Sequence, residues 1–221
     1  MIFFELLLVH LLSDFVFQTA WIAKNKYKAG VLLLHVLLFL AIGLLLFANM
    51  LFTYSTIIWV LLLITVIHFG IDELKILMPE KVLSNPYRKS GYFIFDQILH
   101  MLSLYFGAIL LSNVDISRFF MSIEFTKYVD GLIIVTYIPS FIISYFIDDV
   151  YRRNYLGFAE RACIFIFGMA RLWFLIPLTI FSRDAFEAVI KKCDKKYYHT
   201  FLWSALFGMG ITLFWYYVIM L

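Results

Sequence analysis

The sequence predicts an all-α protein, a polytopic transmembrane helical bundle, and three observations support that fold. Hydrophobic residues make up 64% of the 221 positions, and charged residues only 15%. Several apolar runs approach or exceed the roughly 20 residues that cross a hydrocarbon core. Polar residues gather in short segments between these runs. We therefore expect one integral membrane domain over 1–221, with a four-helix half that carries the buried polar residues (1–112) and a C-terminal helical half (113–221).

The apolar runs predict roughly six or seven membrane passages. The expected spans are 2–20, 31–51, 55–77, 92–112, 131–148, 159–181 and 200–221. The first has no basic segment before it and no small-residue cleavage site, so we expect a retained helix rather than a signal peptide. Charged residues among phenylalanines in 113–128 predict an amphipathic helix at the membrane interface.

Lysine and arginine indicate which connecting segments face the cytoplasm. The first two basic segments carry Lys24, Lys26 and Lys28, and then Lys81, Arg88 and Lys89. If both segments lie inside, the first span begins outside. We therefore expect the N-terminus on the outer side of the membrane.

The sixth apolar run conflicts with this rule. Arg152 and Arg153 fit the inner side, but a single crossing by 159–181 would place the basic segment 191–196 outside. One solution is a re-entrant pair of half-helices, broken near 168–171, that enters and leaves on the cytoplasmic side. The other is a simple crossing against the charge rule.

The remaining charged and thiol side chains of the C-terminal half suggest structural roles. Arg171 falls inside an apolar run, so we expect it to have a carboxylate or a lipid phosphate as its partner. Glu160 and Arg161 are expected to be loop charges or local ion pairs. Cys163 and Cys193 lack the spacing of a metal site and are expected to be ordinary packed cysteines.

The informative residues are ionisable side chains inside the first four spans, where such groups are costly and usually functional. They form three pairs spaced i and i+4, which share a helix face: His10 with Asp14, His68 with Asp72, and Asp96 with His100. In the first and third spans the histidine comes first, whereas in the fourth span, which runs in the opposite direction, the aspartate comes first. The paired residues are therefore expected at the same depth in the membrane in all three spans. This predicts an aspartate ring, joined by His35, and a histidine ring about 6 Å away.

Imidazole nitrogen and carboxylate oxygen suit a divalent metal held between facing helices, zinc foremost, with manganese or iron as alternatives. The candidate ligands are His10, Asp14, His35, His68, Asp72, Asp96 and His100. They outnumber the ligands of one tetrahedral zinc. Two arrangements stay open: two metals that share bridging aspartates, or one metal with the other side chains orienting its ligands. A proton or cation relay and a purely structural polar network are further alternatives.

A metal at this depth predicts hydrolysis of an ester, phosphoester or amide bond in an amphiphile that arrives laterally. Asp14 is the candidate general base, and Gln18 or Lys75 would stabilise developing charge. The alternative functions are a proton or cation translocator and a small membrane effector or scaffold for a cytosolic partner. Membrane lipids, a lipid-like substrate and a second copy of the chain are the expected partners. Nucleic acid is not expected, because the net charge of +3 lies in loops.

Four segments resemble the DUF3307 family of bacterial inner-membrane proteins: HLLSDFVFQTAWIAKNK at 10–26, the single His35, HFGIDELK at 68–75 and DQILH at 96–100. GFAERACIFIFG at 157–168 and the stretch that ends FSRDAF at 186 are similar more loosely. The resemblance implies a helical bundle in the bacterial inner membrane and this choice of polar residues, but no reaction. The pattern is also similar to that of membrane-bound metal-dependent hydrolases. At 168–171 this chain has GMAR where relatives tend to carry a glycine, a glutamine and an acid, which argues against a catalytic role for that segment.

Overall fold

The computed structural model describes residues 2–77, 86–147, 155–191 and 195–220, without the side chains of 86, 145–147, 187–191 and 195–200. The side chains of Lys81, Arg152, Arg153, Cys193 and the basic segment 191–196 therefore lie outside the described part of the chain. The described residues fold almost entirely into helices, which confirms the predicted all-α class. The chain divides into two compact units, 1–130 and 131–221, and each is described by itself.

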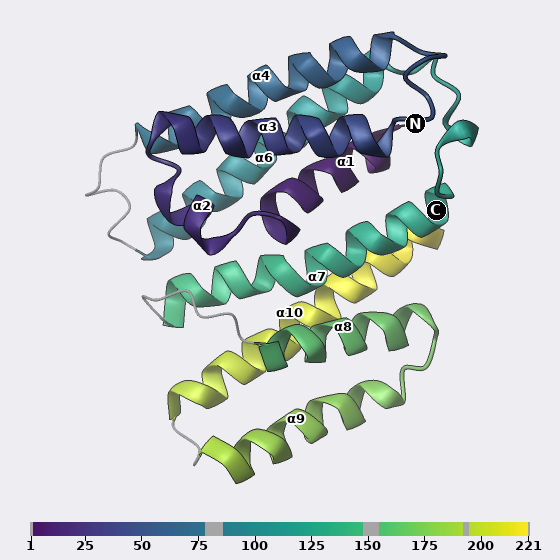
Figure 1. Cartoon of the computed structure of the whole chain (residues 1–221). Helices are drawn as coiled ribbons and strands as arrows, with labels where there is room; N and C mark the ends of the chain where they lie inside the picture. The colour runs from purple at the N-terminus through teal and green to yellow at the C-terminus, as the bar shows by residue number, and fades with distance from the viewer. Residues whose placement is uncertain (1, 78–85, 148–154, 192–194, 221) are drawn as a thin grey trace. The chain divides into compact units, whose positions relative to one another are not determined.

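In the described part of unit 1, four helices form a bundle: α1 (Phe3–Leu11), α3 (Ala29–Leu46), α4 (Thr56–Ile76) and α6 (Pro86–Leu110). Helix α1 packs against α3 and α6, and α4 packs against the same two helices, so the four form a closed ring around a common interior (Figure 1). The predicted basic loop after the first span contains a short helix, α2 (Ala20–Asn25), which packs on α3. Thr19 caps α2, because its hydroxyl accepts from the backbone N–H of Ile22 at 3.2 Å.

Apolar packing sets the spacing of these helices. Leu32, Phe39 and Leu61 have no exposed surface. A Cβ added at Gly107 of α6 would lie 2.4 Å from Ile64 Cδ1 of α4. The glycine therefore allows α4 and α6 to approach closely, as small residues do between helices in membranes.

The first predicted span is not one continuous α-helix. After α1 the chain continues as a π-helical turn, η1 (Leu12–Val16), in which the Phe17 N–H bonds the Leu12 carbonyl at 2.8 Å. The helix then ends before Thr19. A π-turn of this kind re-aims side chains and is frequent at functional sites. Here it carries Asp14.

The predicted interfacial helix over 113–128 is wrong. The chain forms a short 3₁₀ turn, η2 (Ile116–Arg118), and then runs without helix until α7 (Ile123–Ile147) begins. The reason is local: the Asp115 carboxylate accepts from the Ser117 backbone N–H at 3.0 Å, a bond that competes with regular helix.

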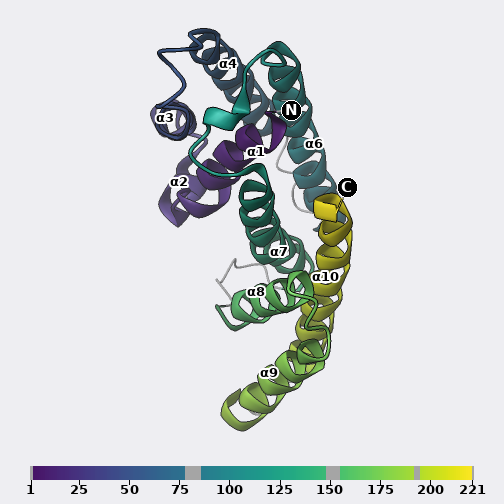
Figure 2. The same ribbon diagram turned by 90° about the vertical axis from the view of Figure 1, so that its right-hand side faces the viewer.

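Unit 2 comprises α7 from residue 131, α8 (Tyr155–Met169), α9 (Leu175–Lys191) and α10 (Lys195–Met220). Helix α8 packs against both α9 and α10 (Figure 2). The predicted break near 168–171 is present, because α8 ends at Met169 and Arg171 has a positive φ of 60°. Re-entry on the cytoplasmic side stays a prediction. Arg171 lies exposed in this turn, with its guanidinium 5.9 Å from the centre of the Tyr216 ring, and its position within the membrane stays a prediction.

Among the described residues, five helical segments are long and apolar enough to cross a membrane: Ala29–Leu46, Thr56–Ile76, Tyr87–Leu110, Ile123–Ser144 and Phe201–Met220. They support a helical membrane protein. The segments α1–η1, α8 and α9 are each shorter. The predicted six or seven passages therefore depend on how these shorter segments cross the bilayer.

Candidate metal centre

The seven predicted ligands lie together inside unit 1. None of these side chains belongs to a residue more than 8% exposed. Their nitrogen and oxygen atoms form three sets, each within 4.8 Å: His10, His68 and His100; Asp14, His35 and His68; Asp72, Asp96 and His100. Because His68 and His100 each occur in two sets, the seven side chains make one connected cluster. The expected convergence is therefore present, whereas the ligand roles stay predictions.

The centre of the cluster is a pair of imidazoles from adjacent helices. His35 Nε2 of α3 lies 3.2 Å from His68 Nε2 of α4. Asp14 Oδ1 lies 3.5 Å from the first nitrogen and 3.6 Å from the second. Asp72 Oδ2 lies 3.3 Å and 3.4 Å from the same two atoms. Two carboxylate oxygens thus contact one pair of imidazole nitrogens; we call these four residues the first position.

The π-turn and a serine hold Asp14 in place. The Ser13 hydroxyl lies 2.8 Å from Asp14 Oδ1 and 2.9 Å from the His10 carbonyl. Ser13 has no exposed surface. Its single hydroxyl therefore links the Asp14 carboxylate to the backbone of the preceding turn and limits the rotation of that side chain.

A lysine from the first basic segment neutralises Asp72. Lys26 Nζ lies 3.1 Å from Asp72 Oδ2 and 3.4 Å from Oδ1, and its side chain is only 19% exposed. The sequence predicts only a topological role for Lys26, as one of three lysines in a basic segment, and gives no signal for this contact. The three lysines of the segment look alike in sequence, and only the placement of α2 against α3 selects one of them.

Gln18 sets the orientation of His35. Its amide nitrogen donates to the Asp14 carbonyl at 3.2 Å, and its oxygen accepts from Lys26 Nζ at 2.9 Å. The same terminal atom lies 3.4 Å from His35 Nδ1. As an oxygen it accepts the Nδ1 proton, which leaves a lone pair on His35 Nε2, the atom that faces His68. Such a partner commonly fixes the tautomer of a metal-binding histidine.

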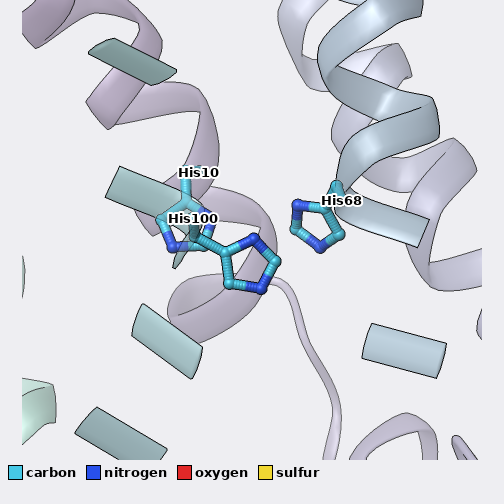
Figure 3. Close-up of side chains that lie close together, drawn as sticks. All are labelled: His10, His68 and His100. Carbon is cyan, nitrogen blue, oxygen red and sulfur yellow. The ribbon is translucent and has the colours of Figure 1, made fainter. Parts of the chain in front are cut away.

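The other three predicted ligands, His10, Asp96 and His100, form a second set. The ring centroids of His10 and His100 lie 4.8 Å apart, and those of His68 and His100 4.3 Å apart, so three helices bring their imidazoles together (Figure 3). Asp96 Oδ1 lies 3.7 Å from His100 Nε2. Gln97 contributes to this set, since its amide donates to Asp96 Oδ2 at 3.0 Å and its oxygen lies 3.4 Å from His10 Nε2.

Lys75 marks the rim of the cluster. Its Nζ donates to Asp96 Oδ2 at 2.9 Å, while 42% of its side chain is exposed. Both residues line a small pocket between α4 and α6 of about 20 Å³, with Ile71, Leu74, Tyr92, Phe95 and Leu99 as the other walls. That volume holds about one water. The pocket links the outside of the bundle to Asp96.

The prediction of two separate rings about 6 Å apart is wrong at the level of side chains. His35 was placed in the aspartate ring and His68 in the histidine ring, yet their Nε2 atoms lie 3.2 Å apart. The height of a Cα along a helix does not fix the height of a ligand atom, because an imidazole extends well away from the backbone. The two rings are therefore one continuous cluster.

Comparison with known proteins places this cluster within a family. No curated protein and no solved structure matches the chain. A family model, described as a protein of unknown function (DUF3307), matches residues 2–129, which include all seven cluster residues and nearly the whole of unit 1. Since that match covers more than half of the chain, this protein belongs to the DUF3307 family.

Proposed function

We propose that this protein is an intramembrane metal-dependent hydrolase that acts on an amphiphilic, lipid-like substrate near the cytoplasmic leaflet of the bacterial inner membrane. The divalent metal, zinc foremost and manganese or iron as alternatives, would bind at the first position. The observation that carries the proposal is the pairing of His35 Nε2 and His68 Nε2 at 3.2 Å, with a carboxylate oxygen within 3.6 Å on each side.

The spacing of these atoms fits a shared metal ion. Ligands of one tetrahedral zinc, with bonds of about 2.0–2.1 Å, lie about 3.3 Å apart. In the first position, the distance between the two imidazole nitrogens and those from each nitrogen to the two carboxylate oxygens range from 3.2 Å to 3.6 Å. Two neutral imidazole nitrogens 3.2 Å apart can form a hydrogen bond only when one of them carries a proton. A metal ion can instead bind the lone pairs of both nitrogens.

The charge of the cluster also fits. Asp14, Asp72 and Asp96 contribute three negative charges, and the ammonium groups of Lys26 and Lys75 contact two of these carboxylates. With neutral histidines the cluster then has one net negative charge. With one divalent ion the cluster has one net positive charge. This charge can be tolerated because the Lys75 side chain is exposed at the edge of the bundle.

A divalent ion in this position would act as a Lewis acid and make water a stronger nucleophile. The chain's own residues divide the remaining work. Asp14 is held by Ser13 against both imidazoles. Gln18 orients His35 through Nδ1, a positioning role rather than the direct charge stabilisation expected from sequence. Lys75, half exposed beside the pocket, is placed to attract a negatively charged headgroup.

Elemental analysis of detergent-purified protein tests the proposal. Wild type should retain a stoichiometric divalent metal, whereas His68→Ala and Asp72→Ala should lose it and still elute as a monodisperse species. Asp115→Ala is the matched control, because its carboxylate lies in the 3₁₀ turn and contacts Ser117 instead. Unchanged metal content in both site variants would overturn the ligand assignment.

A proton or cation translocator is the second candidate. It is favoured by the unbroken series of imidazoles from His35 through His68 to His100 and His10, in which neighbouring ring centroids lie 5.2 Å, 4.3 Å and 4.8 Å apart. Histidine and aspartate chains of this kind carry protons in pumps. Liposomes that contain the purified protein separate the two ideas: a translocator dissipates an imposed pH or ion gradient, and a hydrolase does not.

A further inference from the structure

The second set, His10, Asp96 and His100, contains an unusual concentration of unsatisfied polar atoms. Both nitrogens of His100, Nδ1 of His10 and Oδ1 of Asp96 are buried and have no hydrogen-bond partner among the described residues. The three residues are 1%, 0% and 5% exposed, in the order His100, His10, Asp96. A buried polar atom without a partner costs about 1–3 kcal/mol, so several in one place indicate that something else binds there.

These atoms come from α1 and α6, and each of the three residues has a donor atom close to a residue of the first position. The donor atoms of His10 and His100 lie within 4.8 Å of each other and of a His68 nitrogen. Those of Asp96 and His100 lie within 4.8 Å of an Asp72 oxygen. The donors are imidazole nitrogen and carboxylate oxygen, the same chemistry as in the first position.

His68 and Asp72 of the first position also have donor atoms within 4.8 Å of the second set. In the first position they use Nε2 and Oδ2, and each side chain has a second donor atom. A carboxylate can bridge two ions, and Asp72 has an oxygen within 4.8 Å of donor atoms of both Asp96 and His100. Sites with two divalent ions are a recurrent solution for the hydrolysis of phosphate esters.

We propose that His10, Asp96 and His100 bind a second divalent ion, linked to the first by the Asp72 carboxylate, and that the substrate is an amphiphile with a phosphoester group. This inference rests on the proposed metal centre and narrows its substrate from ester, phosphoester or amide to phosphoester.

Charge selects the phosphoester. Two divalent ions, the three aspartates and the two lysines together leave three net positive charges in a buried cluster. Such an excess is costly unless an anion binds. A phosphoester supplies the anion, whereas a neutral ester or amide does not. Lys75, which is 42% exposed and borders the pocket at Asp96, can turn from that carboxylate towards the incoming phosphate.

Metal stoichiometry tests the second position. Purified wild type equilibrated with zinc should contain two ions per chain, and His100→Ala should contain one. Ser103→Ala is the matched control on the same helix, because its hydroxyl bonds the His100 carbonyl and is not a ligand. If His100→Ala fails to fold, His10→Gln replaces it with the same expectation. One ion per chain in wild type and in His100→Ala alike overturns this inference but leaves the first position intact. No ion in wild type overturns both.

Inorganic phosphate tests the substrate class. It should raise the Tm of zinc-loaded wild type and of Ser103→Ala. It should have a clearly smaller effect on His100→Ala, which keeps the first ion only. No shift in zinc-loaded wild type overturns the assignment of a phosphoester, even if two ions are bound.

Discussion

The buried Arg161 of unit 2 and the second set of unit 1 differ in whether the described part of the protein supplies partners for their polar atoms. In unit 2, Arg161 is 2% exposed and its guanidinium donates to the carbonyls of Val135 (3.0 Å) and Thr136 (2.8 Å) and to the hydroxyls of Ser204 (2.7 Å) and Ser140. In unit 1, the second set leaves four buried donor or acceptor atoms without a hydrogen-bond partner in the described part of the chain.

Arg161 replaces a backbone hydrogen bond that Pro139 removes from α7. Pro139 lies inside α7 and has no N–H, so the carbonyl four residues earlier, that of Val135, loses its helical partner. Arg161 Nε supplies the missing donor. Glu160 pairs with Arg183 and also accepts from the Ser204 hydroxyl at 2.7 Å. This network needs no ligand to explain Arg161.

The comparison teaches how to separate a structural polar network from a binding site in an apolar bundle. Arg161 and the residues of the second set are all at most 5% exposed. The difference is whether the protein itself supplies the partners. Arg161 has hydrogen-bond partners in the protein, whereas neither nitrogen of His100 has one among the described residues. This difference favours an external ligand for His100.

The largest expected effect lies in unit 2. Arg161→Leu should lower the free energy of unfolding by about 3–5 kcal/mol, because it removes four hydrogen bonds of a buried guanidinium and leaves the Val135 carbonyl without a donor. Denaturant unfolding in detergent, followed by circular dichroism, measures this loss. Arg171→Leu is the control, since that arginine is exposed in a turn. Equal effects of the two substitutions would remove the structural role of Arg161.

Metal should stabilise unit 1. At a free zinc concentration a hundred times the Kd, binding adds about 2.7 kcal/mol to the stability of the wild-type protein. A chelator should therefore lower the Tm of wild type and leave that of His68→Ala unchanged. If the chelator does not change the Tm of wild type, the unsatisfied atoms of unit 1 must have an explanation other than a bound metal.

A smaller effect should follow from Gln18→Ala. Loss of the partner that orients His35 should weaken zinc affinity about 10–100-fold, as for other groups that hold a ligand. Competition with a chromogenic chelator measures the Kd. Asn25→Ala is the matched amide control, because its side chain donates to the Trp21 carbonyl and not to the cluster. Equal affinities in the two variants would contradict the orienting role.

The smallest effect concerns Pro139 and Arg161 together. Pro139→Ala restores an N–H that can bond the Val135 carbonyl, so Arg161→Leu should cost about 1 kcal/mol less in that background. A double-mutant cycle on the free energy of unfolding measures this coupling. Strictly additive losses would show that Arg161 does not compensate for the proline.

Sequence pattern located the main features of the fold. Apolar runs of sufficient length predicted the five long helices, because a backbone in hydrocarbon must satisfy its own hydrogen bonds. The i and i+4 spacing of His68 with Asp72 and of Asp96 with His100 predicted which helix faces carry the clustered histidines and aspartates. The break near 168–171 was also predicted, from the charge rule and the change in composition.

Other features could not be read from the pattern. Glu160 and Arg161 were expected to be loop charges or local ion pairs and are instead buried, 3% and 2% exposed, in a network that reaches α7 and α10. The short helix over 116–118 replaced the expected amphipathic one. Lys26 looked like its neighbours Lys24 and Lys28. In each case the outcome depends on a partner far away in the sequence or on one local hydrogen bond.

The sequence by itself determined that this chain forms apolar helices and that three of them carry paired histidines and aspartates on one face, because both properties follow from periodicity along a single helix. Only the tertiary structure decided that His35 meets His68, that Gln18 and Lys26 complete the first position, and that Arg161 is satisfied while His100 is not. Those outcomes depend on which helices pack together and how they are rotated, and side-chain packing across the whole bundle sets that rotation.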